Sequence, residues 1–122
     1  MISHISLGTN NLEQTRSFYG RLISLLRGKE IYASRTVVFW EFLNSSTKLA
    51  LTVPFNNESA NFGNGTMVAL KAENKKEVDR IYFMALSLGA VSEGEPGHRD
   101  PGAFYGAYFR DLDGNKIAIF SR

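Results

Sequence analysis

The side chains of this sequence that could do chemistry fall in two places, the start of the chain and the segment 93–102. His4 stands at the head of the first alternating apolar run, and segment 93–102 combines His98, Arg99 and Asp100 with glycine and proline. Imidazole is both a metal ligand and an acid–base group near neutral pH. His4 is therefore a remnant metal ligand, a polar contact to a substrate, or simply a packed histidine.

Arginine holds a carboxylate through two parallel hydrogen bonds, so Arg99 is our candidate clamp for a carboxylate substrate. Functional residues often lie in loops, and segment 93–102 is rich in glycine and proline. His98 and Asp100 could form a displaced metal site with His4. The alternative is that the whole segment is a solvated loop without a function.

Length and composition are those of a globular chain. The 122 residues suffice for one domain, or for two small modules that share a core. Since cysteine is absent, disulfides, thiolate metal sites and a cysteine nucleophile are excluded. The net charge of +2 is too small to predict binding to nucleic acid or to a membrane surface. We find no leader and no apolar run long enough to span a membrane, and we expect a cytoplasmic protein.

An internal repeat organises the chain. Asn11 is followed three residues later by Gln14, and 63 residues further on Asn74 is followed by Glu77. Asparagine at an N-cap, with Gln or Glu three residues on, is typical of a helix start. The apolar stripes of the two predicted helices are also 63 residues apart: Thr15, Phe18, Tyr19, Leu22 and Leu25, then Val78, Ile81, Tyr82, Ala85 and Leu88. This agreement predicts two copies of one structural unit.

Each helix is expected to follow one strand and to precede three. The predicted strands are 2–7, 29–33, 36–42 and 48–53 in the first half, and 67–70, 91–95, 104–110 and 116–120 in the second. Gly28 and Gly89 suit the C-caps of the two helices. Segment 54–65 is the expected connector. The element order is therefore βαβββ, twice.

Alternation along the strands predicts which residues share a face of the sheet. The residues expected under the helices are Ile5, Leu7, Leu49, Leu51, Val68, Leu70, Ile117 and Ile119. The residues expected on the opposite face are His4, Ser6, Ala50, Thr52, Met67, Ala69, Ala118 and Phe120.

Two aromatic residues are predicted to join that opposite face. Pairing of Asp111 with Asn115 across the last turn would place Tyr108 opposite Ala118, and the repeat would then place Trp40 opposite Ala50. A slip of one residue would substitute Phe39 or Tyr105.

Three segments of the chain resemble the vicinal oxygen chelate superfamily, which includes glyoxalase I, bleomycin-resistance proteins and extradiol dioxygenases. The segments are His4–Gly8 through Phe18 and Tyr19, Asn64–Leu70, and Tyr105–Ile117. Residues 89–105 are similar to a bacterial glyoxalase-like subgroup related to lactoylglutathione lyase. The resemblance implies an α+β fold in which modules at 1–55 and 64–122 form one domain, with a cup-shaped mixed sheet around a cavity. It also implies a homodimer.

The resemblance further implies a divalent metal, held by residues at four positions. These positions fall at His4, Ala50, Met67 and Ala118. Alanine has no donor atom, and a thioether is too soft a ligand for Zn, Ni, Mn or Fe. One imidazole remains, and without the metal the glyoxalase-type reaction loses its Lewis acid. We therefore expect no metal and no cofactor.

Our leading hypothesis is a metal-independent protein that binds a small apolar or aromatic molecule. The expected substrate-binding residues are His4, Trp40, Met67, Arg99, Tyr108, Ala118 and Phe120. The alternative is a glyoxalase-like lyase or isomerase with a relocated metal or metal-free acid–base chemistry, and its catalytic residues stay unassigned. A third possibility is a protein-interaction module with a filled cavity.

Overall fold

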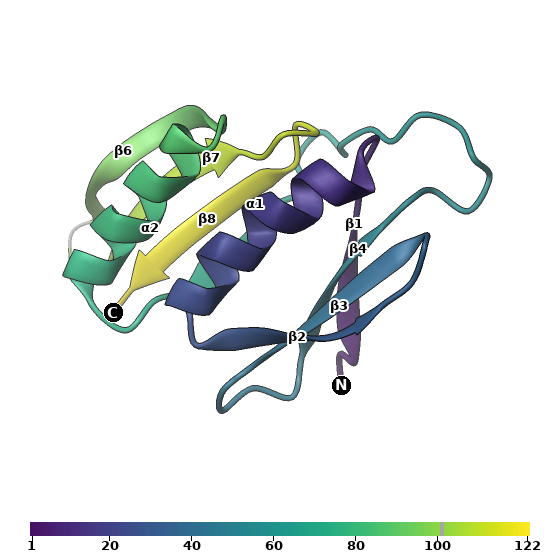
Figure 1. The fold of residues 1–122 in the computed structure, drawn as a ribbon. Coiled ribbons are helices and arrows are strands. Elements are labelled where there is room, and N and C mark those ends of the chain that lie inside the picture. Colours follow the sequence, from purple (N-terminus) through teal and green to yellow (C-terminus); the bar gives the residue numbers. More distant parts are fainter. Residues whose placement is uncertain (101) are drawn as a thin grey trace. The chain divides into compact units, whose positions relative to one another are not determined.

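The computed structural model describes residues 1–100 and 102–122. Pro101, which the sequence analysis included in segment 93–102, lies outside the described residues. The chain divides into two compact units, Met1–Asn61 and Phe62–Arg122, and each contains one helix and four strands (Figure 1). No helix of the described residues is both long and apolar enough to cross a membrane.

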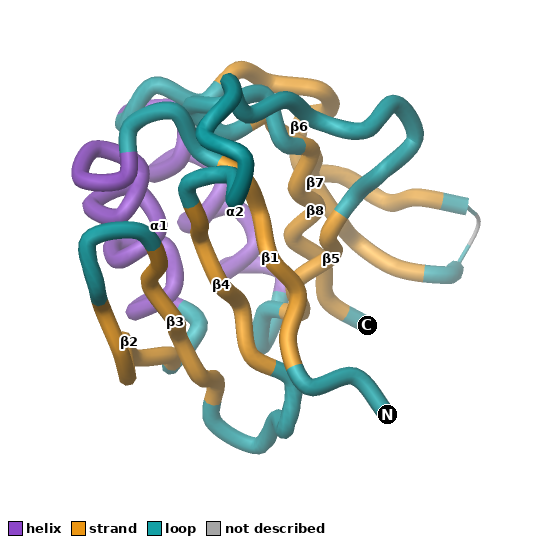
Figure 2. The backbone as a smooth tube through the Cα atoms, turned by 90° about the vertical axis from the view of Figure 1, so that its right-hand side faces the viewer, coloured by secondary structure: helices purple, strands orange, loops and turns teal. Residues whose placement is uncertain are grey.

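The first unit contains β1 (His4–Gly8), α1 (Leu12–Leu25), β2 (Gly28–Ala33), β3 (Val37–Phe42) and β4 (Lys48–Thr52). Its strands form a mixed sheet in the order β1-β4-β3-β2, in which only β1 and β4 are parallel. Figure 2 shows these strands side by side in that order, with α1 along one face.

The second unit contains β5 (Val68–Lys71), α2 (Lys75–Ser87), β6 (Val91–Arg99), β7 (Phe104–Arg110) and β8 (Lys116–Ser121). Its order, β5-β8-β7-β6, is that of the first unit, again with one parallel pair. The predicted α+β fold of two βαβββ modules is confirmed, with a separate four-stranded sheet in each module.

Both helices begin where the sequence predicts. The side-chain oxygen of Asn11 accepts a hydrogen bond from the Gln14 N–H at 3.1 Å, and that of Asn74 accepts one from the Glu77 N–H at 2.9 Å. Each bond satisfies a backbone donor that has no partner inside the helix. The first four residues of each predicted stripe are buried, and the fifth is half-buried. The stripes therefore anchor each helix to its own sheet.

The two helices end differently. Gly89 adopts a positive φ of 107° directly after the C-cap Leu88, as predicted. The prediction for Gly28 is wrong, because Arg27 takes the left-handed position (φ 60°) and Gly28 already starts β2. Gly28 is needed for space: a Cβ there would lie 2.3 Å from Cγ2 of Ile23 and 2.8 Å from the carbonyl oxygen of Glu41.

The register of the last hairpin is as predicted, but that of the first is not. Tyr108 lies opposite Ala118. In the first module, Phe39 lies opposite Ala50, and Trp40 lies opposite Leu49 on the helix-covered face. Trp40 is 2% exposed, so the prediction that it faces away from the helix is wrong.

The cause is the length of the hairpin connection. Residues 41–48 separate Trp40 from its partner Leu49, whereas the shorter segment 110–116 separates Phe109 from Ile117, the equivalent of Leu49 in the repeat. One extra residue moves every earlier side chain of β3 to the other face.

Strand β6 is longer than predicted. The sequence predicts a strand at 91–95 and a loop beyond it, but β6 continues to Arg99. The register shifts between Ser92 and Gly94 and again between Gly94 and Gly97, which brackets Pro96. Proline has no N–H to donate, so it is tolerated at irregular positions of an edge strand, and β6 is such a strand.

Candidate functional site

The first module presents a run of rings on the face of its sheet opposite α1. The His4 ring lies edge-on to Phe39, with ring centroids 5.1 Å apart, and Tyr32 lies edge-on to Phe39 at 6.3 Å. Nδ1 of His4 is 3.2 Å from the Ser3 hydroxyl. His4 is exposed within the described structure. The imidazole therefore has an aromatic neighbour and a polar one, and its outer edge stays accessible.

The equivalent face of the second module carries two cations on one ring. The guanidinium carbon of Arg99 lies 5.3 Å from the Tyr108 ring centroid, and Nζ of Lys116 lies 5.5 Å from it. Such contacts are attractive because the face of an aromatic ring carries negative potential. Arg99 also donates a hydrogen bond to the carbonyl oxygen of Glu95. We call Arg99, Tyr108 and Lys116 the cation–tyrosine cluster.

Two glycines of β6 make room for this arrangement. A Cβ on Gly94 would lie 3.0 Å from Cδ2 of Tyr108 and 3.3 Å from Nη2 of Arg99. A Cβ on Gly97 would lie 3.1 Å from Nη1 of Arg99. The Arg99 side chain therefore passes along its own strand, over positions without side chains, to reach Tyr108.

Small residues and a second pair of rings lie beside the cluster. Ala118 pairs with Tyr108 on one side and with Ala69 on the other, which gives a row of two alanines next to the tyrosine. One step along β8, Phe120 lies edge-on to Phe104 at 6.0 Å. This face of the second module thus combines cations, aromatic rings and the methyl groups of two alanines. Such a composition is typical of sites for small organic ligands.

The cations of the cluster have no acidic partner. Arg110, on the same face, is paired with Glu93 at 2.8 Å. Within residues 1–100 and 102–122, by contrast, neither Arg99 nor Lys116 forms an ion pair. These two side chains are therefore available to an anionic group from outside.

His98 is separated from Arg99 by the alternation of β6. His98 pairs with Tyr105, and their rings meet edge-on at 5.3 Å, whereas Arg99 pairs with Phe104 and reaches Tyr108. Adjacent residues of a strand point to opposite faces. The sequence predicted Arg99 at the site, and among the described charged side chains of segment 93–102 it is Arg99 that lies over the Tyr108 ring.

The donor set does not fit a divalent metal ion. In the first module His4 lies opposite Lys48 and Ala50 lies opposite Ser6, while in the second Ala118 lies opposite Ala69. Met67, which precedes β5, is 43% exposed. In the part of the chain that the structure describes, no three His, Asp or Glu side chains gather as a metal site would require. Three of the four implied ligand positions have no donor suited to such an ion.

Some residues of these faces were not singled out in the sequence. Lys116 lies two residues before Ala118 on one strand, so alternation could have placed it on the same face. Phe39 was named only as the result of a register slip, and Tyr32 was not named at all. Strand β2, which carries Tyr32 and pairs with β3, has a register shift between Glu30 and Tyr32. No pattern in the sequence predicts this shift.

Comparison with known proteins identifies the family. The model of the Glyoxalase/Bleomycin resistance protein/Dioxygenase superfamily matches residues 1–119. A glyoxalase/bleomycin resistance protein from Albidiferax ferrireducens T118, known from its crystal structure, is 31% identical to this chain. The match covers 100% of this chain and 98% of the other, with a TM-score of 0.89. The chain belongs to the Glyoxalase/Bleomycin resistance protein/Dioxygenase superfamily.

More distant structures share the fold. A lactoylglutathione lyase from Agrobacterium tumefaciens is 20% identical over 99% of this chain and 92% of its own, with a TM-score of 0.71. A glyoxalase-related enzyme from Fulvimarina pelagi is 19% identical over 100% and 88%, with a TM-score of 0.80. Comparison with curated proteins found no match.

Proposed function

We propose that this protein binds a small aromatic molecule that carries a carboxylate, without the help of a metal ion. The observation that carries the proposal is the cation–tyrosine cluster, in which two unpaired cations lie within 5.5 Å of the Tyr108 ring centroid. A carboxylate can accept two parallel hydrogen bonds from the guanidinium of Arg99. Lys116 adds a second positive charge beside the same ring.

The residues around the cluster suit the apolar part of the ligand. Ala118 and Ala69 leave the edge of Tyr108 uncovered by larger side chains on their row, and Phe120 borders the next row. Aromatic rings prefer edge-to-face and offset contacts, which Tyr108 and Phe120 can both provide. Met67 contributes a flexible, polarizable side chain that adapts to irregular ligands. Binding then needs apolar contact and an anion clamp, and it needs no Lewis acid.

Matched pairs of ligands test the proposal. We expect benzoate and 2-naphthoate to raise the thermal midpoint of unfolding saturably, and the uncharged amides benzamide and 2-naphthamide to have a weaker effect. Arg99→Met and Lys116→Met keep a long apolar stem and remove the charge, so each should reduce the preference for the carboxylate. Arg21→Met, on the exposed side of α1, is the control and should change nothing.

Two results would contradict the proposal. One is an equal response of the wild type and Arg99→Met to every carboxylate. The other is metal at one equivalent in the purified protein, together with ligand binding that EDTA abolishes and Ni²⁺ or Zn²⁺ restores. Elemental analysis and the same thermal measurements decide both points.

One observation favours the second candidate, a lyase or isomerase with metal-free acid–base chemistry. His4 is exposed on the open face of its sheet, with the Ser3 hydroxyl 3.2 Å from Nδ1. An imidazole so placed can transfer a proton. If the protein is an enzyme, His4→Gln should remove turnover and leave ligand binding in place. If it is a binding protein only, there is no turnover for His4→Gln to remove.

A further inference from the structure

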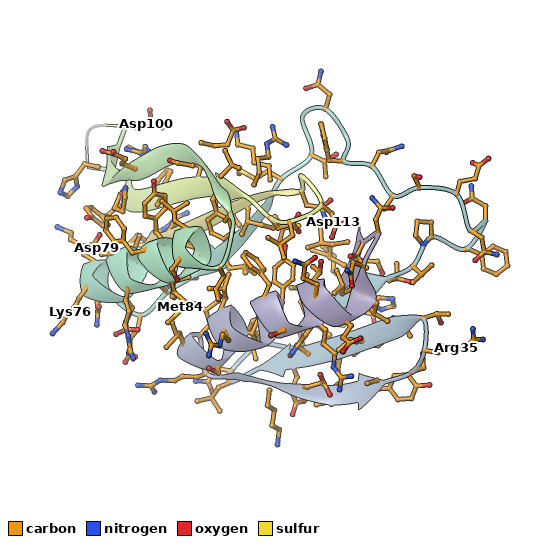
Figure 3. The ribbon with its side chains drawn as sticks, turned by 45° about the horizontal axis from the view of Figure 1, so that its top comes forward. Arg35, Lys76, Asp79, Met84, Asp100 and Asp113 are labelled. Carbon is orange, nitrogen blue, oxygen red and sulfur yellow. The ribbon has the colours of Figure 1, made fainter. Side chains whose placement is uncertain are left out.

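The second module contains a groove that the cation–tyrosine cluster does not explain. Its volume is about 660 Å³, and it lies between the start of α2, residues Gly102 and Ala103 before β7, and the end of β8. Its lining residues are Glu73, Asn74, Lys75, Lys76, His98, Gly102, Ala103, Phe104, Tyr105, Ser121 and Arg122. None of Arg99, Tyr108 and Lys116 lines it. Figure 3 labels Lys76 and Asp79 on α2 and Asp100 at the end of β6.

One wall of the groove is aromatic and held in place. The Tyr105 hydroxyl donates a hydrogen bond to Oδ1 of Asp79 at 2.6 Å, which ties β7 to α2. His98 lies edge-on to the Tyr105 ring at 5.3 Å, and Nζ of Lys75 lies 5.8 Å from its centroid. Phe104 also lines the groove, but it points to the opposite face of β7 and lies edge-on to Phe120. A flat apolar group can therefore pack on this wall.

The other walls are cationic. Lys75 and Lys76 come from α2, and Arg122 directly follows β8. Glu73 is the one carboxylate side chain in the lining, so the lining side chains carry a surplus of two positive charges. Two nearby acids are engaged elsewhere: Asp79 accepts a hydrogen bond from the Tyr105 hydroxyl, and Glu77 pairs with Arg80 at 3.7 Å. The two lysines also open a helix, where the positive end of the helix dipole disfavours cations.

The repeat shows that this set belongs to the second module alone. The residues of the first module that correspond to Lys75 and Lys76 are Leu12 and Glu13, 63 positions earlier. At the end of β8 an offset of 68 matches Arg122 to Pro54. Tyr105 lies opposite Ser121, and its counterpart by strand pairing is Thr36, whose carbonyl oxygen accepts a hydrogen bond from the Val53 N–H. The common fold therefore does not require lysines, a tyrosine or an arginine at these positions, and their gathering around one groove calls for a different reason.

We infer that this groove binds a small aromatic phosphate monoester, with its ring on Tyr105 and its phosphoryl group toward Lys75 and Arg122. A phosphate monoester carries close to two negative charges at neutral pH, which matches the surplus charge of the lining. Lysine binds phosphate as a point charge, and arginine binds it through paired hydrogen bonds. The anion also relieves the unfavourable position of two lysines at the start of a helix.

A titration with phenyl phosphate, followed by the backbone amide signals in nuclear magnetic resonance, tests the inference. We expect saturable shifts at Lys75, His98 and Tyr105. The double variant Lys75→Leu/Lys76→Glu installs the residues of the first module, both of them good helix formers, and should weaken binding at least tenfold. Arg122→Met should weaken it as well. Lys29→Leu, in the first module, is the matched control and should bind like the wild type.

Two further probes separate the ring from the charge. Inorganic phosphate and benzoate should each bind more weakly than phenyl phosphate, because one lacks the ring and the other carries a single charge. Inorganic phosphate binding as tightly as phenyl phosphate would overturn the inference, and so would unchanged binding by the folded double variant. Shifts centred on Tyr108 that disappear in Lys116→Met would assign the ligand to the cation–tyrosine cluster and would also overturn it.

Discussion

The two modules have the same strands in the same order, yet the faces opposite their helices differ in charge. In the first module His4, Phe39 and Tyr32 form an aromatic run, Lys48 lies opposite His4, and Lys29 pairs with Glu41 at 3.8 Å. In the second module, Arg99 and Lys116 gather on Tyr108 without acidic partners. The repeat therefore determines the arrangement of helix and strands. The chemistry of each module depends on side chains that differ between the two copies.

The helix-covered faces show the opposite behaviour. Leu49 and Leu51 of β4 are as deeply buried as Ile117 and Ile119 of β8, which occupy the same positions of the repeat. Interiors are packed as densely as organic crystals, so a change of volume there is costly. On the opposite faces the two modules carry different side chains, such as Phe39 opposite Ala50 where the second module has Tyr108 opposite Ala118. We therefore look for function on the faces where the modules differ.

The largest effect tests the register difference between the two modules. Trp40→Ala should lower the free energy of unfolding by about 3–5 kcal/mol, because it leaves a cavity against Tyr19 under α1. Phe39→Ala, on the open face and only half-buried, should cost much less. Urea denaturation followed by circular dichroism measures both variants without relying on the tryptophan signal.

Tryptophan fluorescence provides an independent check of the same point. Because Trp40 is the single tryptophan and is 2% exposed, its emission should be that of a buried indole and should resist quenching by iodide. Equal costs for Trp40→Ala and Phe39→Ala, or ready quenching, would place Trp40 on the open face and remove the register difference.

The next effect tests the two helix ends. Gly28→Ala should cost about 1–3 kcal/mol, because the added methyl group would meet Ile23 and the carbonyl oxygen of Glu41. Gly89→Ala should cost about 1–2 kcal/mol for a different reason, its φ of 107°. Asparagine tolerates left-handed backbone better than alanine but is larger. It should therefore be the milder change at Gly89 and the more severe one at Gly28, as thermal and urea denaturation can show.

How far the sequence predicts the fold depends on whether a signal is local. The caps Asn11 and Asn74 and the buried helix stripes are local, and the structure has them where the sequence places them. The face to which Trp40 points depends on one extra residue in the connection between β3 and β4. Matching the two halves of the repeat at a constant offset does not detect this extra residue. Faces are therefore less predictable than elements.

The candidate site was predictable in part for the same reason. Tyr108 opposite Ala118 follows from the pairing of Asp111 with Asn115, a local feature of the last turn. The approach of Arg99 to Tyr108 depends on two register shifts in β6 and on the space left by Gly94. The glycines and the proline of that strand are typical of a loop, so the sequence predicted the strand only as far as Glu95.

A smaller effect tests the bond that ties β7 to α2 in the second module. Tyr105→Phe removes the hydrogen bond to Asp79 and should cost about 0.5–1.5 kcal/mol. Tyr32→Phe, in the first module and 56% exposed, is the control and should cost close to nothing. Equal costs for the two variants in urea would mean that the bond to Asp79 adds no stability.

The same bond predicts a dependence on pH. The hydrogen bond to the Asp79 carboxylate, together with burial, raises the pKa of Tyr105 above its ordinary value of 10.0. A group whose pKa is raised by folding stabilises the protein below its unfolded pKa and loses that effect as the pH rises. The difference in stability between the wild type and Tyr105→Phe should therefore be constant below pH 10 and should shrink above it.

The smallest effect concerns an exposed ion pair of the first module. Arg16 donates two hydrogen bonds of 2.7 Å to the Glu30 carboxylate, which lowers the pKa of Glu30 below its ordinary value of 4.5. A lowered pKa gives stability that is present above pH 4.5 and is lost as the pH falls through the folded value. The stability difference between the wild type and Glu30→Gln should therefore disappear in acid. Because both side chains are partly exposed, it should also shrink in 1 M NaCl. A difference that persists in both conditions would show that Glu30 stabilises β2 by packing and not by charge.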